Sequence, residues 1–391
     1  MIVGGSLSNL IAWQPLRTRL LRVASYLPYL IAAAVLLFLM VHGEKFWLSN
    51  DDIRMSMDVG GYGSAAYPSP GLVIESNVVW GWILMHIPDI AGLRGYTLAT
   101  YALFLASGLA VGVSLLQLRI PALLVSACLL GMYTGVILTP QFTLLAGYLA
   151  VGGFALVLAS SGRDARYHLL AASSLLILAG LIRADETALV FLVAVPFLLH
   201  AWRGNARRWR LTWLGTAAVC AVVLAGALVL NLHYSSTGDW QRFNDIDALR
   251  GEFTDYNLGS YFVKHPEKLA GSPVSINDIK LIRAFFYLDP QVFNAANFAP
   301  LVDSVSLKDR FANNVGGYEV TLRLFDSLEV RLLLGLFLLF ALLDWRHGLT
   351  AAASLTILLL LLVAIGLWGR PGIERIYDPA LAGMLVLTVL K

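Results

Sequence analysis

Long apolar segments, separated by short polar ones, run along almost the whole chain. Most of them approach the ~20 residues that an α-helix needs to cross a hydrocarbon core ~30 Å thick. The pattern predicts ten spanning helices, over residues 25–46, 96–117, 120–138, 142–160, 167–182, 187–202, 211–231, 328–345, 349–368 and 377–390. We therefore expect an all-α, polytopic membrane protein.

Segment 72–92 is apolar but is interrupted by polar residues and a proline, and it carries two tryptophans. These features are typical of a helix that lies at the membrane interface rather than one that spans. With this placement the short loops 118–119, 161–166, 203–210 and 346–348, which all contain arginine, fall on the cytoplasmic side. Arginine is enriched in cytoplasmic loops, so both termini are expected to be cytoplasmic in a bacterial inner (plasma) membrane.

The same placement gathers the larger polar segments on the periplasmic or outer face. They are 47–95, 183–186, 232–327 and 369–379. We expect an N-terminal transmembrane module over 1–231 that contains the first outer loop (47–95). A mostly helical outer cap over 232–327 and C-terminal transmembrane helices over 328–391 complete the predicted organisation.

The composition supports this class of protein. Of the 391 residues, 58% are hydrophobic and only 14% are charged, whereas soluble domains have about 25% charged residues. The two cysteines, Cys128 and Cys220, lie in apolar segments and have no metal-ligand spacing. Motifs for nucleotide binding, serine hydrolysis and zinc chemistry are absent from the sequence.

The candidate chemistry lies in the outer segments. Asp51 and Asp52 stand side by side in "SNDDIRMSMD", directly after the first spanning helix. Arg183 lies at the break between two apolar segments, and Arg370 and Arg375 flank a Pro-Gly turn before the last one. Guanidinium groups suit phosphate binding, and a carboxylate can take a proton from a hydroxyl.

An enzyme on the outer face that uses no nucleotide needs a donor that is already activated and carried across the membrane. A sugar on a polyprenyl phosphate is such a donor, because its phosphate leaves readily when cations compensate its charge. The acceptor hydroxyl then needs a carboxylate base, and an acid near the sugar also stabilises an oxocarbenium-like transition state.

The ordered set of features resembles the GT-C superfamily of integral-membrane glycosyltransferases. It comprises the acidic pair after the first span, the interfacial helix in that loop, "QFT" at 141–143, "IR-x-x-E" at 182–186 and the late arginine-bearing segment. The stretch "NDDIRMSMDVGGYGSAAYPSPGLVIESNVVWGW" is similar to bacterial members associated with surface polysaccharides. The resemblance implies a lipid-linked sugar donor, a glycan or glycolipid acceptor, and Asp51 or Asp52 as the base, with Asp51 favoured.

The residues assigned as substrate-binding candidates lie on the same outer face. They are Arg54, Asp58, Tyr62, Arg183, Glu186, Arg370, Arg375 and Tyr377. A divalent metal, Mg²⁺ or Mn²⁺, held by Asp51 and Asp52 is an alternative that the sequence does not require. Membrane lipids are expected partners and nucleic acid is not.

Two other functions stay open at this stage. A polysaccharide polymerase of the O-antigen type would have a similar number of spans, a large outer loop and outer arginines. A transporter or flippase for lipid-linked glycans would place ionisable residues near the middle of the membrane, and the predicted spans are nearly free of charge. A non-catalytic scaffold would leave the gathered outer charges without a role.

Overall fold

The computed structural model describes residues 27–60, 75–117, 120–160, 165–204, 207–236, 238–284, 286–287, 289–314, 323–343, 348–370 and 373–390. Over these ranges the secondary structure is helical, with no strand and a single isolated bridge between Ile90 and Leu93. The expectation of an all-α protein is confirmed for this part of the chain.

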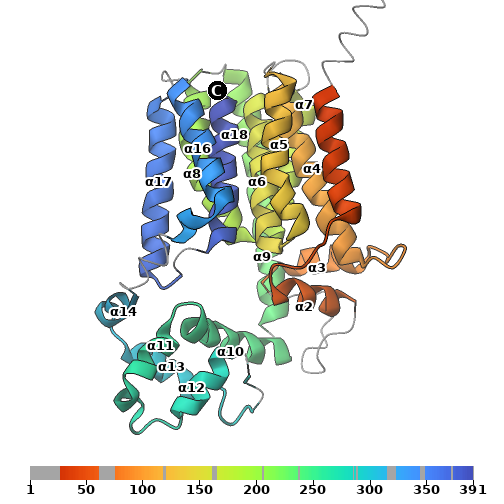
Figure 1. The fold of residues 1–391 in the computed structure, drawn as a ribbon. Coiled ribbons are helices and arrows are strands. Elements are labelled where there is room, and N and C mark those ends of the chain that lie inside the picture. Colours follow the sequence, from red (N-terminus) through yellow and green to blue (C-terminus); the bar gives the residue numbers. More distant parts are fainter. Residues whose placement is uncertain are drawn as a thin grey trace, which may run out of the picture.

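A bundle of apolar helices forms the upper part of Figure 1. Its members are Leu27–His42, α4 (Gly95–Gln117), α5 (Ala122–Leu138), α6 (Phe142–Ala159), α7 (Ala165–Ile182), α8 (Ala184–Gly204), α9 (Arg207–Ser235), α16 (Leu328–Leu343), α17 (Gly348–Leu367) and α18 (Glu374–Val389). Each predicted span overlaps one of these helices. Among the described residues, six are long and apolar enough to cross a membrane: α4, α6, α7, α8, α9 and α17. That the shorter members also cross stays a prediction.

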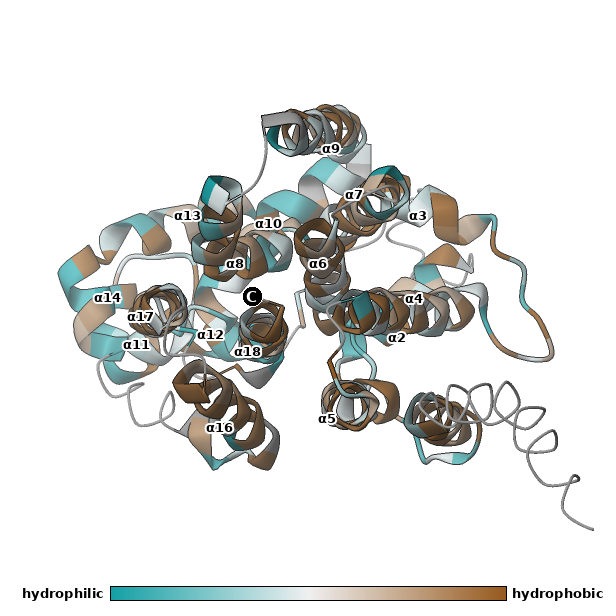
Figure 2. Cartoon of the chain, turned by 90° about the horizontal axis from the view of Figure 1, so that it is seen from above, coloured by the Kyte–Doolittle hydropathy of each residue, from teal (hydrophilic) through white to brown (hydrophobic). Residues whose placement is uncertain are grey.

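Helix α6 is the centre of the bundle. It packs against α4, α7, α8 and α18, and 94% of its apolar window is buried inside the protein. Seen along the bundle in Figure 2, the helices are predominantly apolar around this centre. Helix α9 has only 11% of its window buried, so most of its apolar surface is left for lipid.

Two short helices, α2 (Asn50–Val59) and α3 (Val78–Met85), lie at the end of the bundle that faces the cap (Figure 1). Helix α3 has eight residues and is therefore ~12 Å long, too short to cross a bilayer. The described part of segment 72–92 thus has no spanning helix, which agrees with the interfacial assignment; its depth in the membrane stays a prediction.

The cap is a separate helical layer below the bundle in Figure 1. It consists of α10 (Gly238–Thr254), α11 (Leu258–Lys264), the 3₁₀ helix Pro266–Leu269, α12 (Ile276–Arg283), α13 (Ala295–Ser304) and α14 (Leu307–Asn314). A second 3₁₀ helix, Arg323–Asp326, precedes α16. The cap has its own core, in which Phe253 contacts Phe262 and Phe298. A reciprocal capping box starts α12.

Candidate active site

The two adjacent acids of α2 have different surroundings. Consecutive helical residues point about 100° apart, so one acid can face the protein interior while the other faces a cavity. Asp52 is fully buried, and its Oδ1 accepts hydrogen bonds from the Tyr96 hydroxyl (2.8 Å) and the Phe142 backbone N–H (2.9 Å). Its Oδ2 accepts one from the Ser49 hydroxyl at 2.8 Å. Asp52 therefore ties the start of α2 to α4 and α6.

Asp51 is the acid that lines the large cavity at the cap end of the bundle. Burial raises its pKa, and the nearby Glu75 carboxylate raises it further; Arg375, Arg183 and Arg250 act in the opposite direction. A carboxylate whose pKa is raised is a better proton acceptor when it is ionised. The environment of Asp51 is that of a base.

Burial also raises the pKa of Asp52, to about 6, although the hydrogen bonds from Tyr96, Ser49 and Phe142 stabilise its ionised form. With its three hydrogen bonds inside the protein, this carboxylate is engaged in structure rather than directed at the cavity.

The cavity has a volume of about 620 Å³ and two kinds of wall. Its polar wall is made by α2, Glu75 three residues before α3, the start of α8, the cap helix α10 and the segment around 370–376. Its apolar wall comes from α8 and α17, and includes Leu189, Leu192, Leu361 and Ile365. Because α8 and α17 are both apolar enough to span a membrane, this wall suits a hydrocarbon chain.

Four arginines line the cavity: Arg183, Arg250, Arg370 and Arg375. The first three are each held by a carboxylate. Arg183 Nη1 lies 2.6 Å from Glu75 Oε2.

The cap supplies the carboxylate partners of the next two. Arg250 Nε lies 2.6 Å from Asp247 Oδ1. Arg370 Nη2 lies 3.1 Å from Asp255 Oδ2, and its guanidinium stacks over the Tyr256 ring at 5.3 Å.

Arg375 differs from the other three. Within the described part of the chain its side chain makes no ion pair or hydrogen bond, although Arg375 lowers the pKa of Asp51. Among the four arginines it is therefore the one that no carboxylate of the described residues holds directly.

Glu186 adds a second acid on the α8 side. It is 3% exposed, lines the cavity, and its Oε1 has no hydrogen-bond partner. Leaving a buried carboxylate oxygen without a partner is costly. A hydroxyl-bearing ligand in the cavity would supply the missing donor.

The motifs that the sequence placed far apart meet here. Phe142 and Thr143 of "QFT" line the cavity, and the Arg183 guanidinium lies 5.2 Å from the centroid of the Phe142 ring. The Gln141 side chain accepts a hydrogen bond from the Leu144 N–H and so caps α6. The α6 start therefore links the acidic pair to Arg183.

Comparisons with known proteins identify a distant structural neighbour and no family. No protein-family model and no curated protein matches the chain. Among solved structures, the chain is similar to ArnT from Cupriavidus metallidurans in the apo state, at 14% identity and a TM-score of 0.39, over 94% of this chain and 78% of that chain. So distant a likeness transfers neither fold nor activity, and the functional assignment rests on the site.

Several residues assigned from the sequence are not on the cavity wall. Arg54 and Asp58 pair with each other along α2 at 3.7 Å, and Arg54 stacks over Phe243 at 5.4 Å. Tyr377 is fully buried in α18. Tyr62 lies outside the described residues. Their assignment as substrate-binding residues therefore finds no support in where Arg54, Asp58 and Tyr377 lie.

Sequence reasoning missed the contribution of the cap. Arg250 is not among the residues assigned from the sequence, because only the folded cap brings it to the cavity, where it pairs with Asp247 and Asp255. Glu75 was read as an interruption of an interfacial helix. It lies in the left-handed region, with φ of +61°, which is rare for a residue with a side chain. Both residues line the cavity.

The acidic pair is poorly arranged to share a divalent metal. Mg²⁺ and Mn²⁺ prefer several oxygen ligands directed at one point, whereas both Asp52 oxygens already accept hydrogen bonds within the protein. Among the described residues no cluster of three or more His, Cys, Asp or Glu side chains has metal-binding geometry.

Proposed function

We propose that this chain is a GT-C-type membrane glycosyltransferase. It moves a sugar from a polyprenyl-phosphate-linked donor to a hydroxyl of a glycan or glycolipid acceptor on the outer face of the cell membrane. The observation that carries the proposal is that Asp51, Arg375 and an apolar wall belong to one cavity of about 620 Å³. The sequence resemblance to the GT-C superfamily supports it independently.

The polar and apolar parts of the donor match the polar and apolar walls of the cavity. The polyprenyl chain lies along the apolar wall of α8 and α17, and the phosphate lies against Arg375. Ion pairs to a buried phosphate are strong when the cation is not already compensated. Arg183, Arg250 and Arg370 are each fixed by a carboxylate and so offset most of the negative charge of the polar wall.

The reaction is a displacement at the anomeric carbon of the sugar. The bond between this carbon and the phosphate oxygen breaks, and the leaving phosphate keeps the electron pair under the charge of Arg375. A bond to the acceptor oxygen forms, and the acceptor proton passes to the Asp51 carboxylate. Glu186, buried in the same cavity, accepts a hydrogen bond from a sugar hydroxyl.

Neither alternative has comparable support. A transporter needs ionisable groups within the membrane, and the charged groups of this site instead gather at the cap end of the bundle. A polymerase would depend less on one acidic pair in the first outer loop.

The proposal is tested with a matched pair of substitutions in α2. Asp51→Asn removes the base, so sugar transfer should fall by about 10²–10⁴-fold. Asp58→Asn makes the same change on the same helix, away from the cavity, and should keep transfer near the wild-type level. Mass spectrometry of lipid-linked and surface glycans, in cells that lack the chain and carry one variant each, measures the product. Wild-type product with Asp51→Asn present in the membrane would overturn the mechanism.

A further inference from the structure

A second cavity, of about 370 Å³, adjoins the first. It lies between the end of α7, the end of α9, the start of α10 and the residues before α3. The two cavities share Glu75, Arg183 and Asp185. The ion pair of Glu75 and Arg183, 2.6 Å long, therefore forms part of the wall between them. The volume of the second cavity falls in the range of small-ligand pockets, roughly 300–1,000 Å³.

The chemistry of this second cavity differs from that of the first. Its lining includes one arginine, Arg183, and three carboxylates, Glu75, Asp185 and Asp247. A phosphate would meet an excess of negative charge there. In the first cavity four arginines face five carboxylates, those of Asp51, Glu75, Asp185, Glu186 and Asp255. An anion is therefore better compensated in the first cavity, and the second favours an uncharged ligand.

Hydroxyl and amide groups make up much of the remaining wall. They come from Ser76, Asn77, Asn231, Ser235 and Asn244. Amide and carboxylate side chains can each bind hydroxyl groups, and amides both donate and accept. Such a wall matches a ligand rich in hydroxyls.

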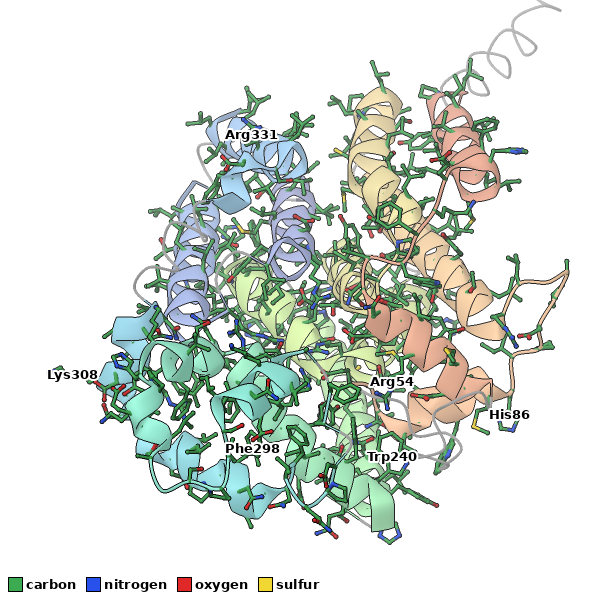
Figure 3. The ribbon with its side chains drawn as sticks, turned by 60° about the horizontal axis from the view of Figure 1, so that its bottom comes forward. Arg54, His86, Trp240, Phe298, Lys308 and Arg331 are labelled. Atoms are coloured by element: carbon green, nitrogen blue, oxygen red, sulfur yellow. The ribbon has the colours of Figure 1, made fainter. Side chains whose placement is uncertain are left out.

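Two aromatic side chains at the start of α10, Trp240 and Phe243, complete the lining. They meet edge to face at 5.6 Å, and Figure 3 shows Trp240 on the same side of the molecule as α2 with its Arg54. Large aromatic side chains provide apolar surface next to a polar rim. The less polar faces of a sugar ring need such a surface.

The shared wall lies next to the base. Glu75 and Arg183 both influence the pKa of Asp51, which places them close to its carboxylate. Glu75 is held there by a left-handed backbone conformation and by its ion pair. A hydroxyl that passes this pair from the second cavity enters the first cavity, which Asp51 lines.

We infer that the second cavity binds the acceptor as an uncharged sugar chain, in the space between α7, α9 and α10. That this sugar chain is the acceptor rests on the proposed function. The binding of neutral sugar at this place is a separate claim that can be measured without any transfer.

The binding test blocks the second cavity after the protein has folded. Ser235 lines the cavity, its hydroxyl makes no hydrogen bond within the described part of the chain, and it ends α9. The variant Ser235→Cys is made together with Cys220→Ala; the other native thiol, Cys128, is buried. Benzyl methanethiosulfonate then places a benzyl group in the cavity of the purified full chain.

The matched control is Val229→Cys in the same background, modified in the same way. Val229 lies on the same helix, is 67% exposed and does not line the cavity. Saturation-transfer difference NMR measures binding of lactose, maltose, cellobiose and N-acetyllactosamine, each tested separately. The detergent is lauryldimethylamine oxide, which has no sugar head group.

We expect at least one disaccharide to bind the unmodified chain, and benzylation at position 235 to reduce its signal at least fivefold. Benzylation at position 229 should leave the signal unchanged. No signal from any disaccharide, or equal loss at both positions, would overturn the inference. If benzylation at position 235 removes the binding and the Asp51→Asn variant keeps full transfer, the sugar site is upheld and the transfer mechanism is rejected.

Discussion

At the scale of single residues, the acidic pair shows what a sequence motif can and cannot tell about the roles of its two members. The sequence places Asp51 and Asp52 together and favours Asp51 through a family resemblance. It cannot show which carboxylate is buried, because the groups that bury Asp52 come from Tyr96 and Phe142, which lie 44 and 90 positions further along the chain. Only the packing of α2 on α4 and α6 separates a positioning role from a catalytic one.

The raised pKa of Asp52 predicts a pH-dependent cost in stability. Below the unfolded value of 3.8 the carboxyl is protonated in both states; between 3.8 and the folded value of about 6 it is protonated only in the folded protein. Stability therefore falls as the pH rises through this window. At ~1.4 kcal/mol per pKa unit, the full cost above the window is on the order of 2–3 kcal/mol.

Asp52→Asn should remove this cost. The amide oxygen can accept from Tyr96 and Phe142 as Oδ1 does, and the amide nitrogen can donate to the Ser49 hydroxyl. The Tm of the variant minus that of the wild type should therefore increase between pH 4 and pH 7, measured by thermal unfolding in detergent. A difference that stays constant across this range would show that Asp52 does not titrate there.

At the scale of elements, α6 determines how closely the bundle can pack behind the site. Gly147 lies where α6 crosses α18 and α8. A Cβ at this position would collide with Pro379 and would lie 3.2 Å from Glu186 Cγ. The absence of a side chain at Gly147 thus sets both the contact between helices and the position of an acid of the cavity.

We predict that Gly147→Ala destabilises the protein by about 1–3 kcal/mol, the usual cost of overpacking a core. Gly131→Ala on α5 is the control, because a Cβ there meets nothing within 4 Å and alanine favours a helix by about 1 kcal/mol over glycine. Thermal unfolding of the two variants side by side should lower the Tm only for Gly147→Ala. Equal Tm values would mean that α6 and α18 pack less closely than described.

Most elements could be predicted because their signals are local. Apolar length located the bundle helices to within a few residues, and the polar interruptions and Pro88 set segment 72–92 apart from them. The cap was predicted to be mostly helical over 232–327 as a whole. The contribution of Arg250 to the cavity could not be read locally, because it depends on how the cap lies against α17 and on the position of Arg370.

At the scale of the whole molecule, the polar groups gather at one end. Asp51, Glu75, Arg183, Arg250 and Arg375 come from separate parts of the chain and line one cavity. The alternation of short loops between helices made this gathering predictable, since every second connection must lie on the same side. Which of the gathered groups would face inward was not predictable, because that depends on helix rotation.

The predicted orientation can be checked with single cysteines at the two ends. Lys308 on α14 is exposed at the edge of the cap (Figure 3), and Arg203 is exposed at the other end of α8. In a background without Cys128 and Cys220, a membrane-impermeant thiol reagent should label Lys308→Cys in cells with a permeabilised outer membrane. It should label Arg203→Cys only after the inner membrane is broken. Labelling of both in unbroken cells would contradict the assigned topology.

The cap is a continuous stretch of chain, inserted between α9 and α16, and it supplies part of the wall of both cavities. Substitutions within the cap can therefore alter the second cavity, which α10 lines, while the order of the bundle helices stays the same. Under the proposed function, related chains can keep the half of the site that binds the donor and change the acceptor through substitutions in one continuous stretch of sequence.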